Sequence, residues 1–187
     1  MYSYAGNFKS KLPKNKIDEY LPIESKSNFN CYQSDFINYH DLPTELQQLC
    51  QFGSIKLGKV KHLETNPRVI IERRENIIEA RKSSHCCMNL LKSKNSHDLA
   101  IHADNEGPAN GPCYSILYYY QIDDNIIDGN LYFYEDDDDK KPPIDNFNPK
   151  SGDVISFNDG IQHCPSQFYT ESITPVIRGL LGIFVLL

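Results

Sequence analysis

Long apolar runs are missing from this chain of 187 residues. No apolar stretch precedes a cleavage site near the N-terminus, so we predict no signal peptide. The longest apolar segment, residues 182–187 with its neighbours, is much too short to cross a bilayer and instead indicates a buried strand. These two absences lead us to expect a cytoplasmic protein that has no membrane segment.

Positive charge is scarce in the second half of the chain. Residues 1–99 carry 15 Lys and Arg against 11 Asp and Glu, whereas residues 100–187 carry only 4 against 14. A surface that tracks a nucleic-acid backbone needs clustered positive charge. Nucleic acid is therefore not expected as a partner of the C-terminal half. Much of the excess comes from the acidic run 135–139, which is most simply a solvated loop.

A secretory signal is also absent for the six cysteines of the chain, Cys31, Cys50, Cys86, Cys87, Cys113 and Cys164. Without a secretory signal, we expect free thiols in a reducing compartment. A structural zinc site formed by His85, Cys86, Cys87 and His97 is an alternative, although adjacent cysteines fit tetrahedral zinc spacing poorly. A cysteine hydrolase is less favoured, because neighbouring side chains on a strand diverge and Cys164 cannot readily reach the ring of His163.

The chain has no internal repeat, and its length suits a single domain with a sizeable core. Residues 1–30 are polar and predict an N-terminal extension with one or two short elements. We expect residues 31–187 to form one domain, with a catalytic core at about 85–187.

Helix and strand signals are mixed before residue 85. The segment 41–45 predicts the start of a helix. This helix is expected to run through Leu46, Leu49 and Cys50 and to stop near Gly53. Residues 55–63 alternate well enough to predict a strand. The segment 69–81 mixes β-branched and charged residues, and both strand and helix remain open there.

From about residue 85 the pattern becomes β-rich, with turn residues between short apolar runs. This arrangement indicates a sandwich or barrel. Residues 128–130 predict a turn, and 136–150 a charged loop. The expected strands or apolar runs are 87–91, 99–101, 113–122, 131–134, 154–157 and 176–186.

Histidine and aspartate recur in a metal-ligand pattern. Two imidazoles and one carboxylate can hold one face of a ferrous ion and leave the opposite face open. His102 and Asp104 lie two residues apart, so a strand places both on one face, and His163 follows from a distant strand. The pattern His-x-acid alone is weak evidence, because His62 and Glu64 repeat it in a basic stretch.

Six ordered segments give this pattern its context. They are His102–Asp104, residues 113–120, residues 129–134, residues 150–157, His163, and residues 175–181 with Arg178. In this order they resemble the core of the Fe(II)/2-oxoglutarate-dependent dioxygenases, prolyl hydroxylases among them. The resemblance covers residues 99–187. It implies a mainly β fold with flanking helices and a double-stranded β-helix (jelly-roll or cupin-like) core.

The resemblance also implies roles for particular residues. His102, Asp104 and His163 stand where the family binds Fe(II); zinc suits the same ligands, so iron rests on the resemblance. Arg178 stands where the family binds the distal carboxylate of 2-oxoglutarate, although its interval from His163 is longer than in prolyl hydroxylases. The further co-substrate contacts expected are Tyr118, with Tyr120 as the alternative in the same register, and Asn130.

The implied reaction is hydroxylation, which consumes 2-oxoglutarate and O2 and releases succinate and CO2. The substrate class left open by the sequence is a protein side chain, a peptide or a small molecule. The competing hypothesis is a non-catalytic β-sandwich that binds a ligand or partner and retains the metal-site pattern.

Overall fold

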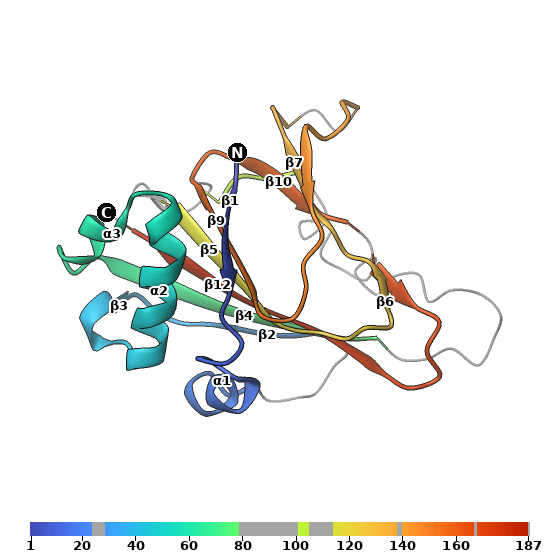
Figure 1. Ribbon diagram of the computed structural model, residues 1–187, viewed down its shortest axis with the longest axis horizontal. Coiled ribbons are helices and arrows are strands. Elements are labelled where there is room, and N and C mark those ends of the chain that lie inside the picture. The colour runs from blue at the N-terminus through green and yellow to red at the C-terminus, as the bar shows by residue number, and fades with distance from the viewer. Residues whose placement is uncertain (24–28, 79–100, 105–113, 138–139, 167, 187) are drawn as a thin grey trace.

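The computed structural model describes residues 1–23, 29–78, 101–104, 114–137, 140–166 and 168–186. Strands dominate these ranges, and the helices lie in the first third of the chain (Figure 1). No helix in these ranges is long and apolar enough to cross a membrane. The elements are β1 (Ser3–Asn7), α1 (Lys14–Tyr20), β2 (Phe29–Gln33), β3 (Ile37–Asn38), the 3-10 turn η1 (Tyr39–Asp41), α2 (Thr44–Lys56), α3 (Val60–Leu63), β4 (Arg68–Ile78), β5 (Tyr114–Ile122), β6 (Ile126–Asp128), β7 (Leu131–Tyr134), β8 (Asp145–Phe147), β9 (Asp153–Asn158), β10 (Gln162–Pro165), β11 (Phe168–Thr170) and β12 (Val176–Val185).

The strands form one large antiparallel sheet and two small ones. The large sheet has the order β1-β9-β5-β12-β4-β2, with β3 also paired to β4. The small sheets are β10-β7-β8 and β11-β6. Leu131 and Phe133 of β7 pack against β5 and β9 residues of the large sheet, among them Leu117 and Phe157. One hydrophobic core of the molecule therefore lies between the large sheet and the three-stranded one.

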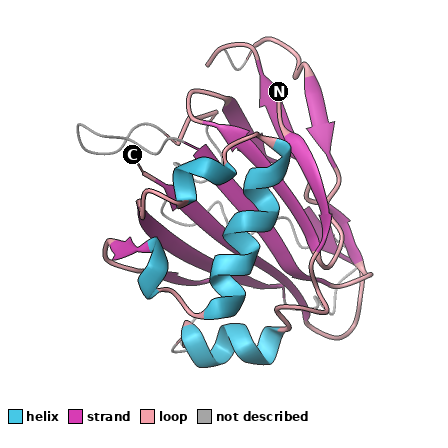
Figure 2. Cartoon of the chain, turned by 60° about the vertical axis from the view of Figure 1, so that its left-hand side comes forward, coloured by secondary structure: helices cyan, strands magenta, loops and turns pink. Residues whose placement is uncertain are grey.

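The helices cover the opposite face of the large sheet (Figure 2). Leu46, Leu49 and Cys50 of α2 are buried there against Ile116 of β5 and Val154 of β9. Helix α2 continues through Gly53, where we predicted that it stops. A Cβ atom at this position would lie 2.6 Å from Ile116 Cγ2. The glycine thus serves close helix-to-sheet packing rather than a helix end.

Strand β5 is buried on both faces, and its side chains alternate between the two cores. Tyr118 and Tyr120 face the helices, whereas Leu117 and Tyr119 face the small sheet. Full burial of one such large side chain contributes roughly 1.5–3 kcal/mol. Because the period of a strand is two residues, this register decides which tyrosine can reach the space between the sheets.

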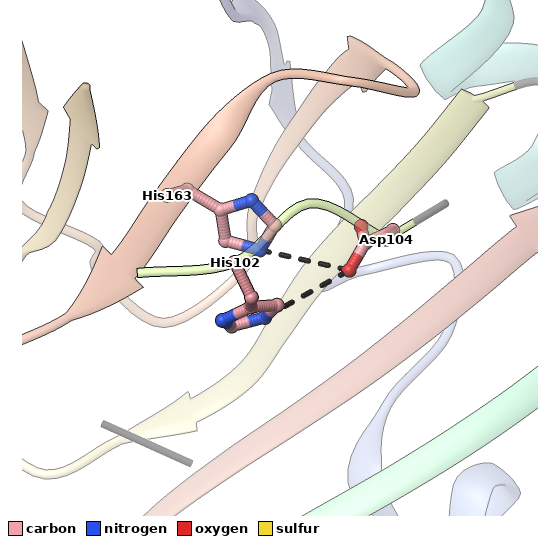
Figure 3. A group of neighbouring side chains, drawn as sticks. All are labelled: His102, Asp104 and His163. Carbon is pink, nitrogen blue, oxygen red and sulfur yellow. Dashed lines mark ion pairs between the residues drawn. The ribbon is translucent and has the colours of Figure 1, made fainter. Parts of the chain in front are cut away.

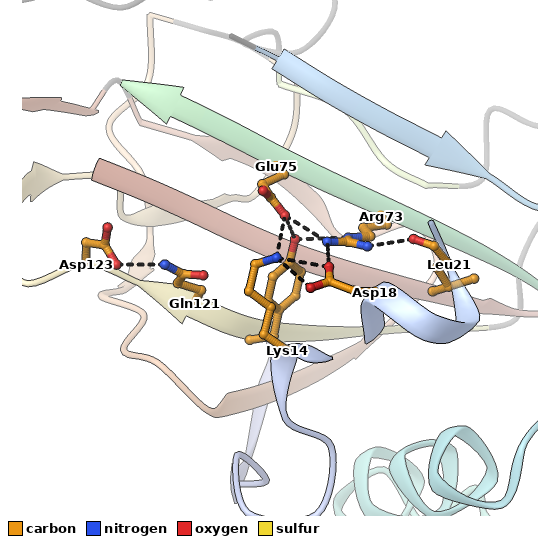
Figure 4. Close-up of polar contacts among 8 residues, drawn as sticks. Lys14, Asp18, Leu21, Arg73, Glu75, Gln121 and Asp123 are labelled. Atoms are coloured by element: carbon orange, nitrogen blue, oxygen red, sulfur yellow. Dashed lines mark hydrogen bonds and ion pairs between the residues drawn. The ribbon is translucent and has the colours of Figure 1, made fainter. Parts of the chain in front are cut away.

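Strand β4 alternates in the same way, but with charges. Arg73 is 2% exposed and points to the helix side, where it donates hydrogen bonds to the Leu21 carbonyl at 2.6 Å and to the Tyr120 hydroxyl at 3.2 Å (Figure 4). Asp18 of α1 and Glu75, the latter at 2.9 Å, pair with the same guanidinium. This pairing is required, because a buried cation without partners is strongly destabilising.

The N-terminal residues belong to this fold, contrary to the predicted extension. Strand β1 pairs with β9 at the edge of the large sheet. Phe8, Leu12 and Ile17 are buried in the helix-side core. Because residues 1–30 are mostly polar, their composition did not reveal that these few apolar side chains are buried in the core.

Two further expectations before residue 85 are resolved. Residues 55–63, predicted as a strand, form the end of α2, a turn with Gly58 at φ +66° and helix α3. The undecided segment 69–81 is strand β4 as far as Ile78.

The later strands were predicted closely, and β5, β7, β9 and β12 occupy the expected segments. The predicted charged loop 136–150 additionally contains the short strand β8. The expected run 87–91, most of 99–101, and the alternative zinc ligands His85, Cys86, Cys87 and His97 lie outside the described residues.

Candidate active site

The two histidines are brought together by backbone pairing. His102 and His163 form an antiparallel bridge, in which each amide donates to the other carbonyl, at 3.0 and 2.8 Å. Strand β10, which carries His163, also pairs with β7. The segment with His102 therefore lies alongside β10 and extends the small sheet by one bridge.

Asp104 completes a cluster of three potential ligands (Figure 3). Its Oδ1 atom lies 3.9 Å from Nε2 of His102 and 3.7 Å from Nε2 of His163. Ligands sit about 2 Å from a metal ion, so two ligands of one ion lie about 3 Å apart. The observed spacing is slightly wider, and the three donor groups face one another. Two imidazoles and one carboxylate suit Fe(II), so the residues fit the ion that the resemblance implies.

Neighbouring groups orient these ligands. Ser115 of β5 donates a hydrogen bond from Oγ to Oδ2 of Asp104, which leaves Oδ1 turned toward the histidines. Nδ1 of His163 lies 3.0 Å from the Ile161 carbonyl, so this nitrogen donates and Nε2 keeps a free lone pair. Burial of the ring lowers the pKa of His163, which favours the neutral form that a metal requires.

Arg178 lies in the same cavity, deeply buried at 5% exposed. Its guanidinium carbon stands 5.4 Å from the Tyr119 ring centre and 5.1 Å from that of Phe168. Its hydrogen bond from Nη2 to the Gly129 carbonyl is long, at 3.4 Å. Burial lowers the pKa of Arg178, yet a guanidinium keeps its proton in proteins. This cation therefore provides a site for an anion.

Two buried polar atoms lack a hydrogen-bond partner among the described residues at this place. They are Nε of Arg178 and the hydroxyl of Tyr119. Burial raises the pKa of Tyr119, so its phenol stays protonated and can donate a hydrogen bond. Buried polar groups are rarely left unpaired in proteins. An oxyanion that accepts from both groups satisfies them together.

One cavity joins the three metal-ligand candidates to Arg178. Its floor is the face of β4, β5 and β12 that is turned away from the helices. Its other side carries residues of the small sheets. The lining is mostly apolar, with charged groups at separate points. The lining residues are Glu72, Arg74, Asn76, His102, Asp104, Leu117, Tyr119, Leu131, His163, Pro165, Phe168, Arg178, Leu180, Gly182 and Phe184.

Tyr118 and Tyr120, the tyrosines predicted to contact the co-substrate, lie on the other face of β5. The Tyr118 hydroxyl donates to the Leu12 carbonyl at 2.7 Å, and that of Tyr120 donates to Glu75 at 2.7 Å. Tyr119 lines the cavity instead. The alternation was predicted correctly, but three consecutive tyrosines carry no mark of which face is inner.

Asn130 adjoins the cavity without lining it. Its backbone carbonyl accepts a hydrogen bond from the Ser166 amide at 2.7 Å, and its Oδ1 atom is buried without a partner among the described residues. The neighbouring residue, Gly129, is the one whose carbonyl meets Arg178.

Four residues of the candidate site were not predicted from the sequence: Ser115, Tyr119, Glu72 and Arg74. A strand assignment for 69–81 would have placed Glu72, Arg74 and Asn76 on one face by alternation. For Ser115 no comparable signal exists, because no sequence pattern links it to its hydrogen-bond partner Asp104.

Solved structures resemble this chain at low sequence identity. The structure titled IDO from Bacillus thuringiensis superposes with a TM-score of 0.62 at 14% identity, covering 94% of this chain and 84% of that one. A 2OG-Fe(II) oxygenase family protein from Burkholderia pseudomallei gives 0.52 at 13% identity, covering 92% and 75%. A prolyl-4-hydroxylase from Pseudomonas putida gives 0.52 at 11% identity, covering 99% and 91%. No family model and no curated protein matches the sequence.

The chain has the fold of the 2-oxoglutarate-Fe(II) oxygenases. The predicted fold class, a mainly β protein with a double-stranded β-helix core, is thereby confirmed. In this oxygenase fold the candidate ligands His102, Asp104 and His163 and the buried Arg178 share one cavity between the sheets.

Proposed function

We propose that this protein is an Fe(II)- and 2-oxoglutarate-dependent oxygenase that hydroxylates a protein side chain or a small molecule. One observation carries the proposal: a His-Asp-His cluster and a buried arginine with an unpaired Nε atom line the same cavity. The cluster suits a metal, and the arginine suits the far end of a dicarboxylate. Either feature alone has simpler explanations, whereas the pair in an oxygenase fold supports this reaction class.

In the proposed reaction, bound Fe(II) with 2-oxoglutarate and O2 supplies an oxidant for an unactivated C–H bond and yields succinate and CO2. The chain's residues supply binding and orientation. His102, Asp104 and His163 hold the metal, and Ser115 and the Ile161 carbonyl fix two of these ligands.

Arg178 and Tyr119 bind the distal carboxylate of 2-oxoglutarate in this proposal. Arg178 offers a planar fork of donors that matches a carboxylate, and Tyr119 adds one hydroxyl donor. The apolar residues around them, such as Leu117 and Phe168, exclude water and strengthen these charge-assisted bonds.

The test is a titration of the purified protein with Mn(II) and then 2-oxoglutarate, followed by succinate measurement after iron loading. We expect His163→Ala to lose metal binding, and Arg178→Gln to retain metal binding but lose affinity for 2-oxoglutarate. Absence of both 2-oxoglutarate binding and succinate formation in the parent protein would contradict the proposal. Binding of 2-oxoglutarate without any turnover would instead favour the non-catalytic binding protein.

A further inference from the structure

Asn76 places a buried amide in the wall of the candidate active site. It is 9% exposed and lines the cavity from β4. Its side chain has no hydrogen-bond partner among the residues that the structure describes. Glu72 and Arg74, on the same face of β4, differ in this respect, since Nε of Arg74 donates to Oε1 of Glu72 at 2.6 Å. Buried polar groups are rarely left unpaired in proteins, so the Asn76 amide indicates that a ligand group belongs beside it.

The strand register places Asn76 beside the proposed co-substrate anchor. Asn76 lies directly opposite Arg178 in the antiparallel pair of β4 and β12. Residues that are opposite in such a pair share one face of the sheet, with Cβ atoms about 4.5–5.5 Å apart. Both side chains line the cavity. The amide and the guanidinium are therefore neighbours in the cavity floor.

Tyr119 flanks Arg178 on the other side. It belongs to β5, the second neighbour of β12 in the large sheet, and its ring centre lies 5.4 Å from the Arg178 guanidinium carbon. In the described part of the chain, Nε of Arg178 and the hydroxyl of Tyr119 have no hydrogen-bond partner. Three adjacent strands thus each contribute one polar side chain with an unused donor, and the cation stands in the middle of this row.

We propose that Asn76 completes the site for the distal carboxylate of 2-oxoglutarate and donates a hydrogen bond to it from Nδ2. This inference rests on the proposed function. A carboxylate accepts at about four lone-pair positions. Arg178 occupies two of them with its planar fork, Tyr119 a third and Asn76 the fourth. Because the amide is uncharged, it adds a donor and leaves the balance of one guanidinium against one carboxylate unchanged.

Such a row selects a 2-oxo acid that carries a second carboxylate. 2-Oxopentanoate has the carbon chain of 2-oxoglutarate, with a methyl group in place of the distal carboxylate. It leaves the buried donors of Asn76, Arg178 and Tyr119 without a partner, which costs affinity. Both ligands present the same 2-oxo acid group. The ratio of their affinities therefore isolates what a residue contributes at the distal carboxylate.

The experiment measures this ratio in the parent protein and in two variants of Asn76. 2-Oxoglutarate and 2-oxopentanoate are titrated calorimetrically into protein loaded with Mn(II). In Asn76→Ala we expect the preference for 2-oxoglutarate to fall about tenfold or more, as for loss of a hydrogen bond to a charged group. Mn(II) binding and the affinity for 2-oxopentanoate should stay unchanged.

Asn76→Asp keeps the shape of the side chain but places a negative charge opposite Arg178. This carboxylate pairs with the guanidinium and repels that of the ligand, so we expect a lower preference for 2-oxoglutarate than in Asn76→Ala. Asn38→Ala is the matched control. Asn38 is exposed and pairs with Arg68 at the other end of β4, so its loss should leave the ratio at the parent value.

A structural role for Asn76 gives a different result. If the amide only supports the cavity wall, Asn76→Ala weakens both ligands by the same factor and the ratio stays at the parent value. That outcome overturns the inference, as does an Asn76→Asp variant that retains the parent preference.

The outcomes also separate this inference from the proposed function. Binding of 2-oxoglutarate and succinate formation in the parent protein, with an unchanged ratio in Asn76→Ala, overturn the inference and leave the oxygenase proposal standing. A lowered ratio in a protein that binds 2-oxoglutarate but forms no succinate supports the inference and contradicts the proposed reaction. Absence of 2-oxoglutarate binding in the parent protein overturns both.

Discussion

Ser115 shows how one hydroxyl can orient a candidate metal ligand. Its hydrogen bond to Oδ2 holds Asp104 with Oδ1 toward the two histidines. Loss of such a supporting group typically reduces metal affinity about 10- to 100-fold. We therefore expect Ser115→Ala to weaken Mn(II) binding in a direct titration by about this factor. Ser156→Ala is the control, since that buried hydroxyl bonds the Gly53 carbonyl on the helix side. Equal affinities in both variants would refute the role of Ser115.

Tyr118 and Tyr119 are adjacent and chemically identical, yet they face different cores. Tyr119→Phe removes a donor from the cavity, and we expect it to weaken 2-oxoglutarate binding about tenfold, as for loss of a hydrogen bond to a charged group. Tyr118→Phe removes the bond to the Leu12 carbonyl. We expect this change to lower the free energy of unfolding by about 1 kcal/mol and to leave 2-oxoglutarate affinity intact. Calorimetric titration and urea unfolding of both variants check the contrast; the reverse pattern would mean that the register of β5 is different.

At the scale of the element, β4 carries two charge systems on its two faces. On the helix side, burial opposes ionisation of Asp18, but hydrogen bonds from Lys14 and Arg73 outweigh it and lower its pKa below 3.8. A lowered carboxyl pKa gives stability that is present above pH 3.8 and is lost as the pH falls through the folded-state pKa. The link between α1 and the sheet is therefore expected to weaken in acid.

Arg73→Ala tests this link. It leaves Glu75 and the Leu21 carbonyl without their buried partner, so we expect a loss of about 3–5 kcal/mol in the free energy of unfolding at neutral pH. The difference from the parent protein should shrink below pH 3.8, where Asp18 becomes protonated in the unfolded chain. Urea unfolding at both pH values measures it. Lys16→Ala, which removes an exposed pair with Glu19, should have no measurable effect. A pH-independent loss in Arg73→Ala would contradict the pairing with Asp18.

The elements also show what the sequence could predict. Strands β5, β7, β9 and β12 follow from apolar runs with turn residues between them, because burial imposes those residue types directly. Residues 55–63 were misassigned, because short helices and strands share such patterns and only tertiary packing separates them. Gly53 was wrongly taken as a helix end, because the need for a glycine comes from close packing against Ile116, which is distant in sequence.

For the candidate site, motif order predicted which residues would lie together but not their surroundings. His102, Asp104, His163 and Arg178 stand in a recognisable succession, and the structure brings all four to one cavity. The register of β5 depends on the packing of both faces, which no single segment encodes, so Tyr119 was missed. The Glu72–Arg74 pair was missed because the strand that holds it was not assigned.

At the scale of the whole molecule, the N-terminal segment and the cavity depend on each other. Residues of the first 21 positions support the back of the strands that form the cavity floor: the Leu12 carbonyl accepts from Tyr118, and the Leu21 carbonyl accepts from Arg73. The candidate active site therefore should not form in a chain that begins at residue 31, where the sequence predicted that the domain begins. The substitution Leu12→Ala probes this dependence without removing any part of the chain.

Leu12 is fully buried, and its truncation to alanine leaves a cavity that costs about 2–5 kcal/mol. We expect urea unfolding of Leu12→Ala to show this loss in one transition, with Mn(II) binding lost at the same urea concentration, because the N-terminal core and the candidate metal cluster share β5. Added Mn(II) should raise the midpoint of that single transition, since it binds the folded state alone. Ile173→Ala, at a side chain 92% exposed, is the control and should leave the midpoint unchanged. Loss of the N-terminal core at a lower urea concentration than loss of Mn(II) binding would show that the two parts unfold independently.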